Sequence, residues 1–255
     1  MSAASGDMMA VAAARALSDG QSCFVGIGAP STAANLARAT HAPRLALIYE
    51  SGCIGSKPTR LPLSIGDGEL AETADAVVPV PEIFAYWLQP GRIDVGFLGA
   101  AQLDRFANLN STVIGSYRVP TTRLPGAGGA PEIAGCCKQV LVMIRQSRRS
   151  FVSQLDFRTS VGFGDGPGDR ARLGLRGGGP AMVITDLGVL VPDPDSCELV
   201  LTRIHPGVEP DDVRAATGWD LQVSADLSRT EAPTEEELAA LRRLQQAEEV
   251  PVAGR

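Results

Sequence analysis

The feature that most constrains this fold is an apolar run, Leu45 to Tyr49, that ends on a carboxylate, Glu50, and then turns at Ser51-Gly52. An apolar run of this length is typical of a strand buried on both faces in a parallel sheet. Ligand crevices of open α/β sheets lie at the carboxyl ends of the strands, so Glu50 is predicted to border such a crevice. A helix cap or an arginine's partner would be an ordinary structural role for the same glutamate.

Length and charge narrow the class of protein. The chain has 255 residues, a length that fits one large α/β domain or two small ones, and we expect a single domain over residues 1–255. A net charge of −6, without basic blocks interleaved with aromatic residues, argues against a nucleic acid partner. The first apolar run, Met8 to Leu17, follows Asp7 and is interrupted by Arg15, which indicates an amphipathic helix and not a signal peptide. No run approaches the roughly eighteen apolar residues of a membrane span, so no membrane partner is expected.

The cysteines and histidines restrict the chemistry. Five cysteines are an odd number without C-x-x-C spacing, which indicates a reduced, cytoplasmic chain without structural zinc. The chain has two histidines, His41 and His205, so a histidine-rich metal site is not expected. Catalysis would therefore depend on carboxylates, amides or a thiol. His205 follows a predicted strand and is a weaker candidate for a chemical role.

The order of predicted elements is that of an α/β protein. We predict a first helix that ends near Leu17 and further helices over residues 32–39, 82–88, 210–217 and 234–248. The last of these has a capping box at Thr234 and Glu237. The predicted strands cover residues 23–25, 45–50, 95–98, 140–144, 182–185, 189–191 and 199–204. The predicted fold is an open, mostly parallel sheet sandwiched by helices, with a more antiparallel C-terminal portion.

Two glycine-containing turns are candidates for ligand contact. Gly26 and Gly28 follow the strand at residues 23–25, where missing side chains let the backbone approach a ligand. This turn lacks both the lysine of a phosphate-binding Walker loop and the third glycine of the dinucleotide fingerprint. The run Pro125–Ala130 holds three glycines, whose backbone N–H groups suit an oxyanion, although a flexible surface loop has the same composition.

Several motifs, taken together, resemble one family. The segments GIGAPS at 26–31, YESG at 49–52, GAAQLD at 99–104 and PGAGGA at 125–130 resemble the β subunit of family I coenzyme A transferases. The segments NSTVIGSY at 110–117, DGPGDRARLGL at 165–175, VITDLGVL at 183–190 and TGWDLQVS at 217–224 are similar to the glutaconate type. The resemblance covers nearly the whole chain, with the motifs in the same order.

The resemblance implies the coenzyme A transferase fold, pairing with a separate α subunit, and an acyl-CoA as substrate, without a tightly bound cofactor or a metal. It also implies that Glu50 is the covalent nucleophile. The turn reads YESG, as in the glutaconate branch, and not the SENG of the succinyl-CoA branch. The residues expected in the loops of the oxyanion and CoA site are Gly128, Gly129, Ala130, Gly26, Gly28 and Gln102.

A carboxylate can carry this chemistry if it is held against the thioester. Its attack on an acyl-CoA gives a mixed anhydride and the CoA thiolate, and the thiolate then attacks the enzyme's side of the anhydride to leave a glutamyl-CoA thioester. Each step passes through an oxyanion, for which one amide donor is worth about 2.7–4 kcal/mol in other acyl-transfer enzymes. Cys53 is a rival nucleophile three residues from Glu50, although a cysteine between glycine and isoleucine is more typical of a buried apolar position.

Three functions remain open at this point. The first is the β subunit of a heteromeric CoA transferase that moves CoA between an acyl-CoA and a small di- or branched carboxylate through Glu50. The second is a hydrolase, carbon–carbon lyase or decarboxylase of the same fold that uses Glu50 as a base. The third is a non-catalytic acyl-CoA-binding subunit.

Overall fold

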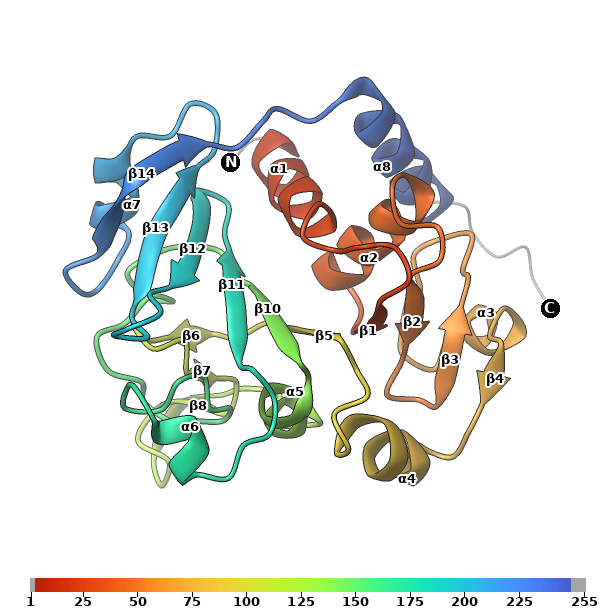
Figure 1. Cartoon of the computed structure of the whole chain (residues 1–255), viewed down its shortest axis with the longest axis horizontal. Helices are drawn as coiled ribbons and strands as arrows, with labels where there is room; N and C mark the ends of the chain where they lie inside the picture. The colour runs from red at the N-terminus through yellow and green to blue at the C-terminus, as the bar shows by residue number, and fades with distance from the viewer. Residues whose placement is uncertain (1–2, 249–255) are drawn as a thin grey trace. The chain divides into compact units, whose positions relative to one another are not determined.

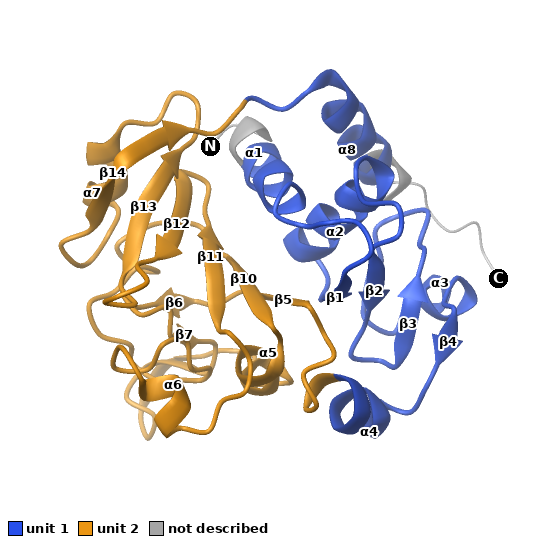
Figure 2. Ribbon diagram, in the orientation of Figure 1, with its two compact units in different colours: residues 1–87, 232–255 blue, residues 88–231 orange. Residues whose placement is uncertain are grey.

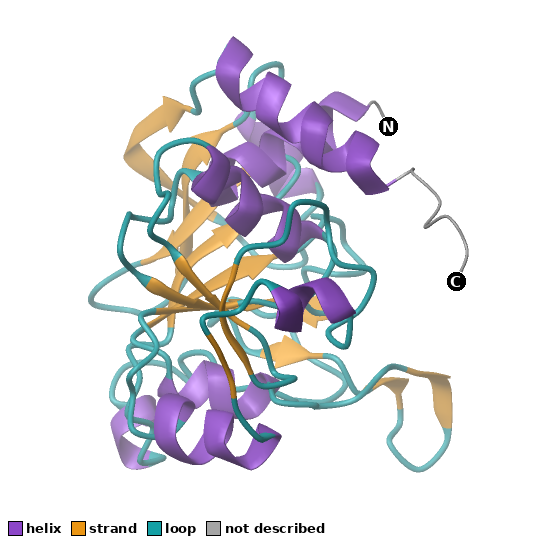
Figure 3. Ribbon diagram, turned by 90° about the vertical axis from the view of Figure 1, so that its right-hand side faces the viewer, coloured by secondary structure: helices purple, strands orange, loops and turns teal. Residues whose placement is uncertain are grey.

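The computed structural model describes residues 3–248, which form two compact units (Figures 1 and 2). Unit 1 comprises the described residues of 1–87 and 232–255, and unit 2 comprises residues 88–231. The chain therefore leaves unit 1 after Trp87 and returns to it at Ala232. Helices and strands occur throughout both units, and the predicted α/β class is confirmed (Figure 3).

The strands of unit 1 follow the order β1-β2-β3-β4. They are β1 (Ser22–Phe24), β2 (Ala46–Ile48), β3 (Cys53–Ser56) and β4 (Ala76–Val77). β1 and β2 are parallel, as predicted, with Phe24 opposite Ile48. β3 returns antiparallel to β2, and β4 is antiparallel to β3. The sequence analysis did not predict β3 or β4, because strands of two to four residues carry little periodic signal.

The helices of unit 1 include one from the far end of the chain. They are α1 (Ala3–Ala14), α2 (Ala29–Ala39), α3 (Gly68–Glu72), α4 (Val80–Glu82) and α8 (Glu235–Glu248). α8 packs on α1 and α2, and Arg15 forms an ion pair with Glu237 at 2.7 Å. The predicted capping box is confirmed, since Glu237 N donates to Thr234 Oγ1 and Thr234 N to a Glu237 carboxylate oxygen. The predicted helix at residues 82–88 is a π-helix over Ile83–Leu88 that continues α4.

The main sheet of unit 2 follows the order β14-β13-β12-β11-β10-β5. Its strands are β5 (Val95–Leu98), β10 (Gln139–Met143), β11 (Pro180–Ile184), β12 (Gly188–Pro192), β13 (Leu199–Ile204) and β14 (Gln222–Arg229). β5, β10 and β11 are parallel, whereas β12 is antiparallel to both of its neighbours. The predicted antiparallel character of the C-terminal portion is therefore confirmed. β14, which pairs parallel with β13, was not predicted, because its residues are mostly polar and exposed.

Short elements complete unit 2. They are the antiparallel pairs β6 (Gln102–Leu103) with β7 (Leu109–Asn110) and β8 (Val113–Gly115) with β9 (Pro120–Arg123), and the helices α5 (Ala130–Cys136), α6 (Asp169–Arg172) and α7 (Pro210–Ala215). In the core, the ring of Phe151 stacks on Trp219 with centroids 5.7 Å apart. Within residues 3–248, no helix is long and apolar enough to cross a membrane, and all five cysteines are free.

Candidate active site

Glu50 lies in the tight turn that joins β2 to β3 in unit 1. Gly52 N donates to Tyr49 O at 3.0 Å, and Tyr49 N donates to Cys53 O at 2.9 Å, so Glu50 occupies the second position of a closed four-residue turn. Its side chain is half-buried. Among residues 3–248, none forms a hydrogen bond or an ion pair with its carboxylate. The turn therefore fixes the backbone of Glu50 and leaves its carboxylate available to a partner from outside the chain.

Gly52 explains why the turn is so tight. Its φ of 107° belongs to a region that residues with a side chain rarely adopt, and a Cβ there would collide with the carbonyl oxygen of Val78. Val78 N in turn donates to Gly52 O at 3.0 Å. Two separate constraints, backbone conformation and close approach, therefore require glycine two residues after Glu50.

Gly26 and Gly28 lie at the same edge of the unit 1 sheet as Glu50. Gly26 follows β1 as Glu50 follows β2, and Val25 N donates to Ile48 O at 3.0 Å between these parallel strands. A Cβ added at either glycine would meet no atom within 4 Å, and Gly28 has a φ of 74°. The structure thus brings these predicted residues together with Glu50, with the glycine backbone open to approach.

The second glycine loop precedes α5 in unit 2. A Cβ at Gly128 would meet nothing within 4 Å, and its φ is 50°. Ala130 N donates to Ala127 O at 3.0 Å, so this amide closes a turn. Within residues 3–248, no acceptor engages the amides of Gly128 and Gly129. Of the three donors that the family resemblance implied, these two are unpaired, and their role in binding an oxyanion stays a prediction.

Gln102 is part of a buried hydrogen-bond network in unit 2. Its side chain is 6% exposed, and Nε2 donates to Asp156 Oδ2 at 2.9 Å. Oε1 accepts hydrogen bonds from Asn110 Nδ2 at 2.7 Å and from Asp156 N at 3.1 Å. One amide therefore joins β6, β7 and the segment after β10. The predicted contact of Gln102 with a ligand stays a prediction, since its polar atoms already have these partners.

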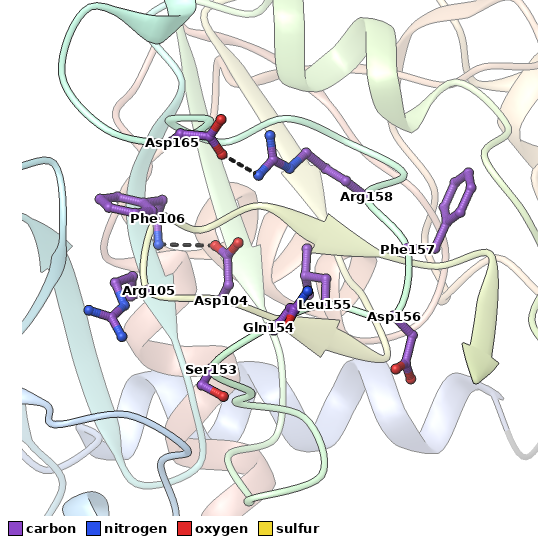
Figure 4. Close-up of a pocket in the computed structure, with 10 residues that line it drawn as sticks. All are labelled: Asp104, Arg105, Phe106, Ser153, Gln154, Leu155, Asp156, Phe157, Arg158 and Asp165. Carbon is purple, nitrogen blue, oxygen red and sulfur yellow. Dashed lines mark hydrogen bonds and ion pairs between the residues drawn. The ribbon is translucent and has the colours of Figure 1, made fainter. Parts of the chain in front are cut away.

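A cavity of about 510 Å³ adjoins this network (Figure 4). Its lining comes from the connection between β6 and β7, from residues 153–158 and from Asp165. Arg158 pairs with Asp165 at 2.6 Å, and the two side chains are directed toward each other. Burial raises the pKa of Asp104, which accepts hydrogen bonds from Phe106 N and Asn108 N. The sequence analysis missed this cavity, because residues 153–158 carry no motif.

Cys53 and His205, the alternative candidates for a chemical role, lie in core positions. Cys53 is 4% exposed in β3, as its apolar sequence context predicted. His205 is 2% exposed, with Nε2 2.9 Å from Thr185 O and Nδ1 3.1 Å from Thr230 Oγ1, and burial lowers its pKa. Neither arrangement favours a role in catalysis.

The fold and these loops define the class of protein: an α/β protein with a free carboxylate and open glycine backbones after the carboxyl ends of its strands. In residues 3–248 no group of three or more histidine, cysteine, aspartate or glutamate side chains could hold a metal ion. The free carboxylate and the unpaired backbone amides of these loops are the groups available for chemistry with a bound ligand.

Comparison with known proteins identifies the family. The sequence model described as Coenzyme A transferase matches residues 7–216. The chain is 62% identical over 239 residues to the subunit designated B of the 3-oxoadipate CoA-transferase of Pseudomonas knackmussii, covering 94% of this chain and 92% of that protein. Its structure resembles glutaconate coenzyme A-transferase from Acidaminococcus fermentans, with a TM-score of 0.90 and 34% identity over 97% and 98% of the two chains. The decarboxylase AibA/AibB gives a TM-score of 0.81 and 27% identity, covering 94% of each chain.

The chain belongs to the coenzyme A transferase family, as a subunit of the B, or β, type. Enzymes of this family use acyl-CoA substrates. The designation B of the Pseudomonas relative implies a partner of the other type, A or α. The family resemblance and the fold derived from the sequence motifs are confirmed.

Proposed function

We propose that this chain is the β subunit of a heteromeric CoA transferase that moves CoA between an acyl-CoA and a small dicarboxylate through a glutamyl-CoA thioester on Glu50. The observation that carries the proposal is the carboxylate of Glu50, which has no partner within residues 3–248 and sits on a turn held by backbone hydrogen bonds. The dicarboxylate is supported by the 62% identical relative, whose name specifies 3-oxoadipate.

The reaction uses Glu50 in both half-reactions. One carboxylate oxygen attacks the thioester carbon, the carbon–sulfur bond breaks, and CoA leaves as thiolate. The thiolate attacks the Glu50 carbonyl of the mixed anhydride, which releases the donor acid and leaves the glutamyl-CoA thioester. An acceptor carboxylate then attacks this thioester, and the same steps in reverse return Glu50. The unpaired amides of Gly128 and Gly129 are the proposed oxyanion donors.

The chain is proposed to act as one functional domain with a separate α subunit. The family match over residues 7–216 crosses from unit 1 into unit 2, which supports treating residues 1–255 as one domain in function. The α subunit would complete the substrate site in an αβ complex or a multiple of it. Five free cysteines support a place in the cytoplasm.

A second candidate function is decarboxylation or hydrolysis of an acyl-CoA with Glu50 as a base. The similarity to the decarboxylase AibA/AibB favours keeping it, because a shared fold does not fix the reaction. A free carboxylate can accept a proton as well as attack a thioester. The difference between the two functions is a covalent bond to Glu50.

The experiment is mass spectrometry of the chain, co-expressed with its partner subunit, after incubation with acyl-CoAs of dicarboxylic acids and borohydride. Reduction of a thioester on Glu50 to the alcohol removes about 14 mass units. The change is expected in the tryptic peptide Leu45–Arg60, because Pro58 blocks cleavage after Lys57.

Two variants control this measurement. The Glu50→Gln variant should remain unmodified, whereas the Glu72→Gln variant, changed at an exposed glutamate of α3, should still form the thioester on Glu50. Consumption of acyl-CoA by a chain that stays unmodified would overturn the transferase proposal in favour of the second function. Binding without consumption would favour a non-catalytic subunit.

A further inference from the structure

A second cavity, in unit 1, lies away from Glu50. It measures about 310 Å³, and its lining comes from α2, from α8 and from the segment after β3: Asn35, Arg38, Ala39, Pro58, Thr59, Ala240, Arg243 and Leu244. α2 and α8 pack side by side (Figure 1). Glu50 follows the carboxyl end of β2, whereas α2 ends before the amino end of that strand and Pro58 follows the antiparallel β3. The cavity is therefore at the opposite edge of the unit 1 sheet from Glu50.

The charges of this cavity are unbalanced. Arg38 and Arg243 line it without any carboxylate in the lining. Arg38 is half-buried and Arg243 is exposed, and among residues 6–245, whose side chains the structure describes, none forms a hydrogen bond or ion pair with either guanidinium. Burial lowers the pKa of Arg38, and the nearby Tyr49 and Asp75 oppose this shift. Its place in the last turn of α2 gives a favourable helix-dipole interaction but leaves its N–H donors unpaired.

The carboxylates near this wall already have partners. Glu69 accepts hydrogen bonds from Thr59 N and Thr59 Oγ1, at 2.6 and 2.7 Å, and pairs with Arg60. Asp75, which interacts electrostatically with Arg38, forms its ion pair with Lys57. The free donors of the cavity are therefore the two guanidinium groups.

Asn35 also lines this wall, but its polar atoms lie in the core. Its side chain is 3% exposed, and Nδ2 donates to Ser31 O at 2.9 Å. Its Oδ1 is buried, and its amide lies beside the Tyr49 hydroxyl. A ligand in the cavity would therefore be bound by the two guanidinium groups, whose planar donor sets suit the oxygens of a phosphate.

We propose that the cavity between α2, α8 and the segment after β3 binds a phosphoryl group through Arg38 and Arg243. Two arginines match the charge of a phosphate dianion, and their planar donor sets match its oxygens. The group could come from free phosphate or from the phosphorylated end of a nucleotide, both of which present the same chemistry. Because the cavity lies at the opposite sheet edge from Glu50, binding there is an addition to the proposed CoA transfer and not a step in it.

The test is calorimetric titration of the whole chain, co-purified with its partner subunit, with inorganic phosphate in a chloride buffer. We expect saturable binding, with Kd raised at least tenfold in Arg243→Gln and in Arg38→Gln. Arg242→Gln changes the neighbouring exposed arginine of α8, which is outside the cavity lining, and should bind phosphate as the unchanged protein does. Arg243 is exposed, so its variant remains informative even if Arg38→Gln fails to fold.

Further titrants identify the source and the chemistry. If adenosine 3′,5′-bisphosphate binds more tightly than phosphate, and this binding is lost in Arg243→Gln, the source of the phosphoryl group is a nucleotide. If the two ligands bind with equal affinity, the source is free phosphate. Absence of phosphate binding, equal binding by Arg243→Gln, or tighter binding of adipate would overturn the proposal. So would a loss of complex assembly in Arg243→Gln, because the arginine would then pair with a carboxylate of the partner. CoA transfer by Arg243→Gln should stay unchanged without phosphate.

Discussion

The turn around Glu50 and the glycine loop before α5 use the same residue type for opposite purposes. At Gly52 the missing side chain lets the backbone pack directly on Val78 O, and a Cβ would collide. At Gly128 a Cβ would meet nothing within 4 Å. The first glycine makes a turn rigid, whereas the second leaves space beside backbone amides. The difference shows that a glycine-rich motif has to be interpreted from its surroundings and not from its composition.

This contrast corresponds to two chemical needs. A nucleophilic carboxylate gains from a fixed position, because orientation supplies much of the rate enhancement of an intramolecular reaction. Amide donors for an oxyanion must be reachable by the substrate, so nothing of the protein can fill the space before them. The closed turn at Glu50 suits the first need, and the open backbone at Gly128 suits the second.

The largest effect is expected from Glu50→Gln, which separates the role of the carboxylate from that of its turn. Removing the nucleophile should lower kcat by about 10³-fold or more, equivalent to about 4 kcal/mol. The free energy of unfolding should not change, because no residue among 3–248 pairs with this carboxylate. Steady-state kinetics and urea denaturation measure the two quantities, with Glu72→Gln as the control. A parallel loss of stability would show that Glu50 has a structural role.

Gly52→Ala tests the closely packed turn around Glu50. The strained φ and the collision with Val78 O should together lower the free energy of unfolding by about 3 kcal/mol. Gly168→Ala is the matched control, because its φ of 80° is also positive, in the left-handed helical region, but the space around it is open, so a cost of about 1 kcal/mol is expected. Equal losses in urea denaturation would mean that conformation alone, without close packing, explains Gly52.

Gly128→Ala tests the glycine loop before α5, where the space beside the backbone is open. Its φ of 50° lies where other residues are tolerated at a cost of about 1 kcal/mol, and the new methyl group meets no protein atom. If substrate approaches these amides, kcat/KM should fall by about tenfold, or about 1.4 kcal/mol. Gly207→Ala, with a φ of 81° and open space in the same unit, should keep full activity. Full activity in Gly128→Ala as well would remove this loop from the site.

The smallest effect is expected from Tyr49→Phe. The ring of Tyr49 is fully buried, and burial raises the pKa of its hydroxyl, which makes no well-formed hydrogen bond in residues 3–248 although the polar groups of Ser31 and Asn35 lie beside it. Removing an unpaired buried hydroxyl should leave the stability unchanged or raise it by up to about 1 kcal/mol. Thermal denaturation checks this, with the exposed Tyr86→Phe as control. A marked loss of stability would show that the hydroxyl has a partner, such as a buried water, that helps to hold the turn.

The sequence was sufficient for the features that depend on local pattern. An apolar run followed by Glu50 predicted the buried strand and the turn that ends it, because consecutive apolar residues are the main sequence signal of a strand buried on both faces. The same reasoning located β5 and β10. The proposal that Glu50 is the nucleophile came from the family motif, since a carboxylate after a strand has several ordinary roles.

The features that depend on distant contacts could not be predicted. β6 and β7 contain two residues each, and the network of Gln102 joins them to Asp156, 54 positions along the chain. The collision at Gly52 involves Val78, which no local pattern connects to the turn. The cavity beside Arg38 is lined by both α2 and α8, which pack together but are far apart in the sequence.

The division of unit 1 into two segments has a consequence for the order in which the protein is made. Every residue of unit 2 leaves the ribosome before α8, whose buried Leu241 and Leu244 belong to the packing with α1 and α2. During translation, unit 2 can therefore fold while the apolar faces of α1 and α2 still lack this cover. Unit 1 therefore begins first and is completed last, and its helices α1 and α2 receive the cover of α8 only at the end of synthesis.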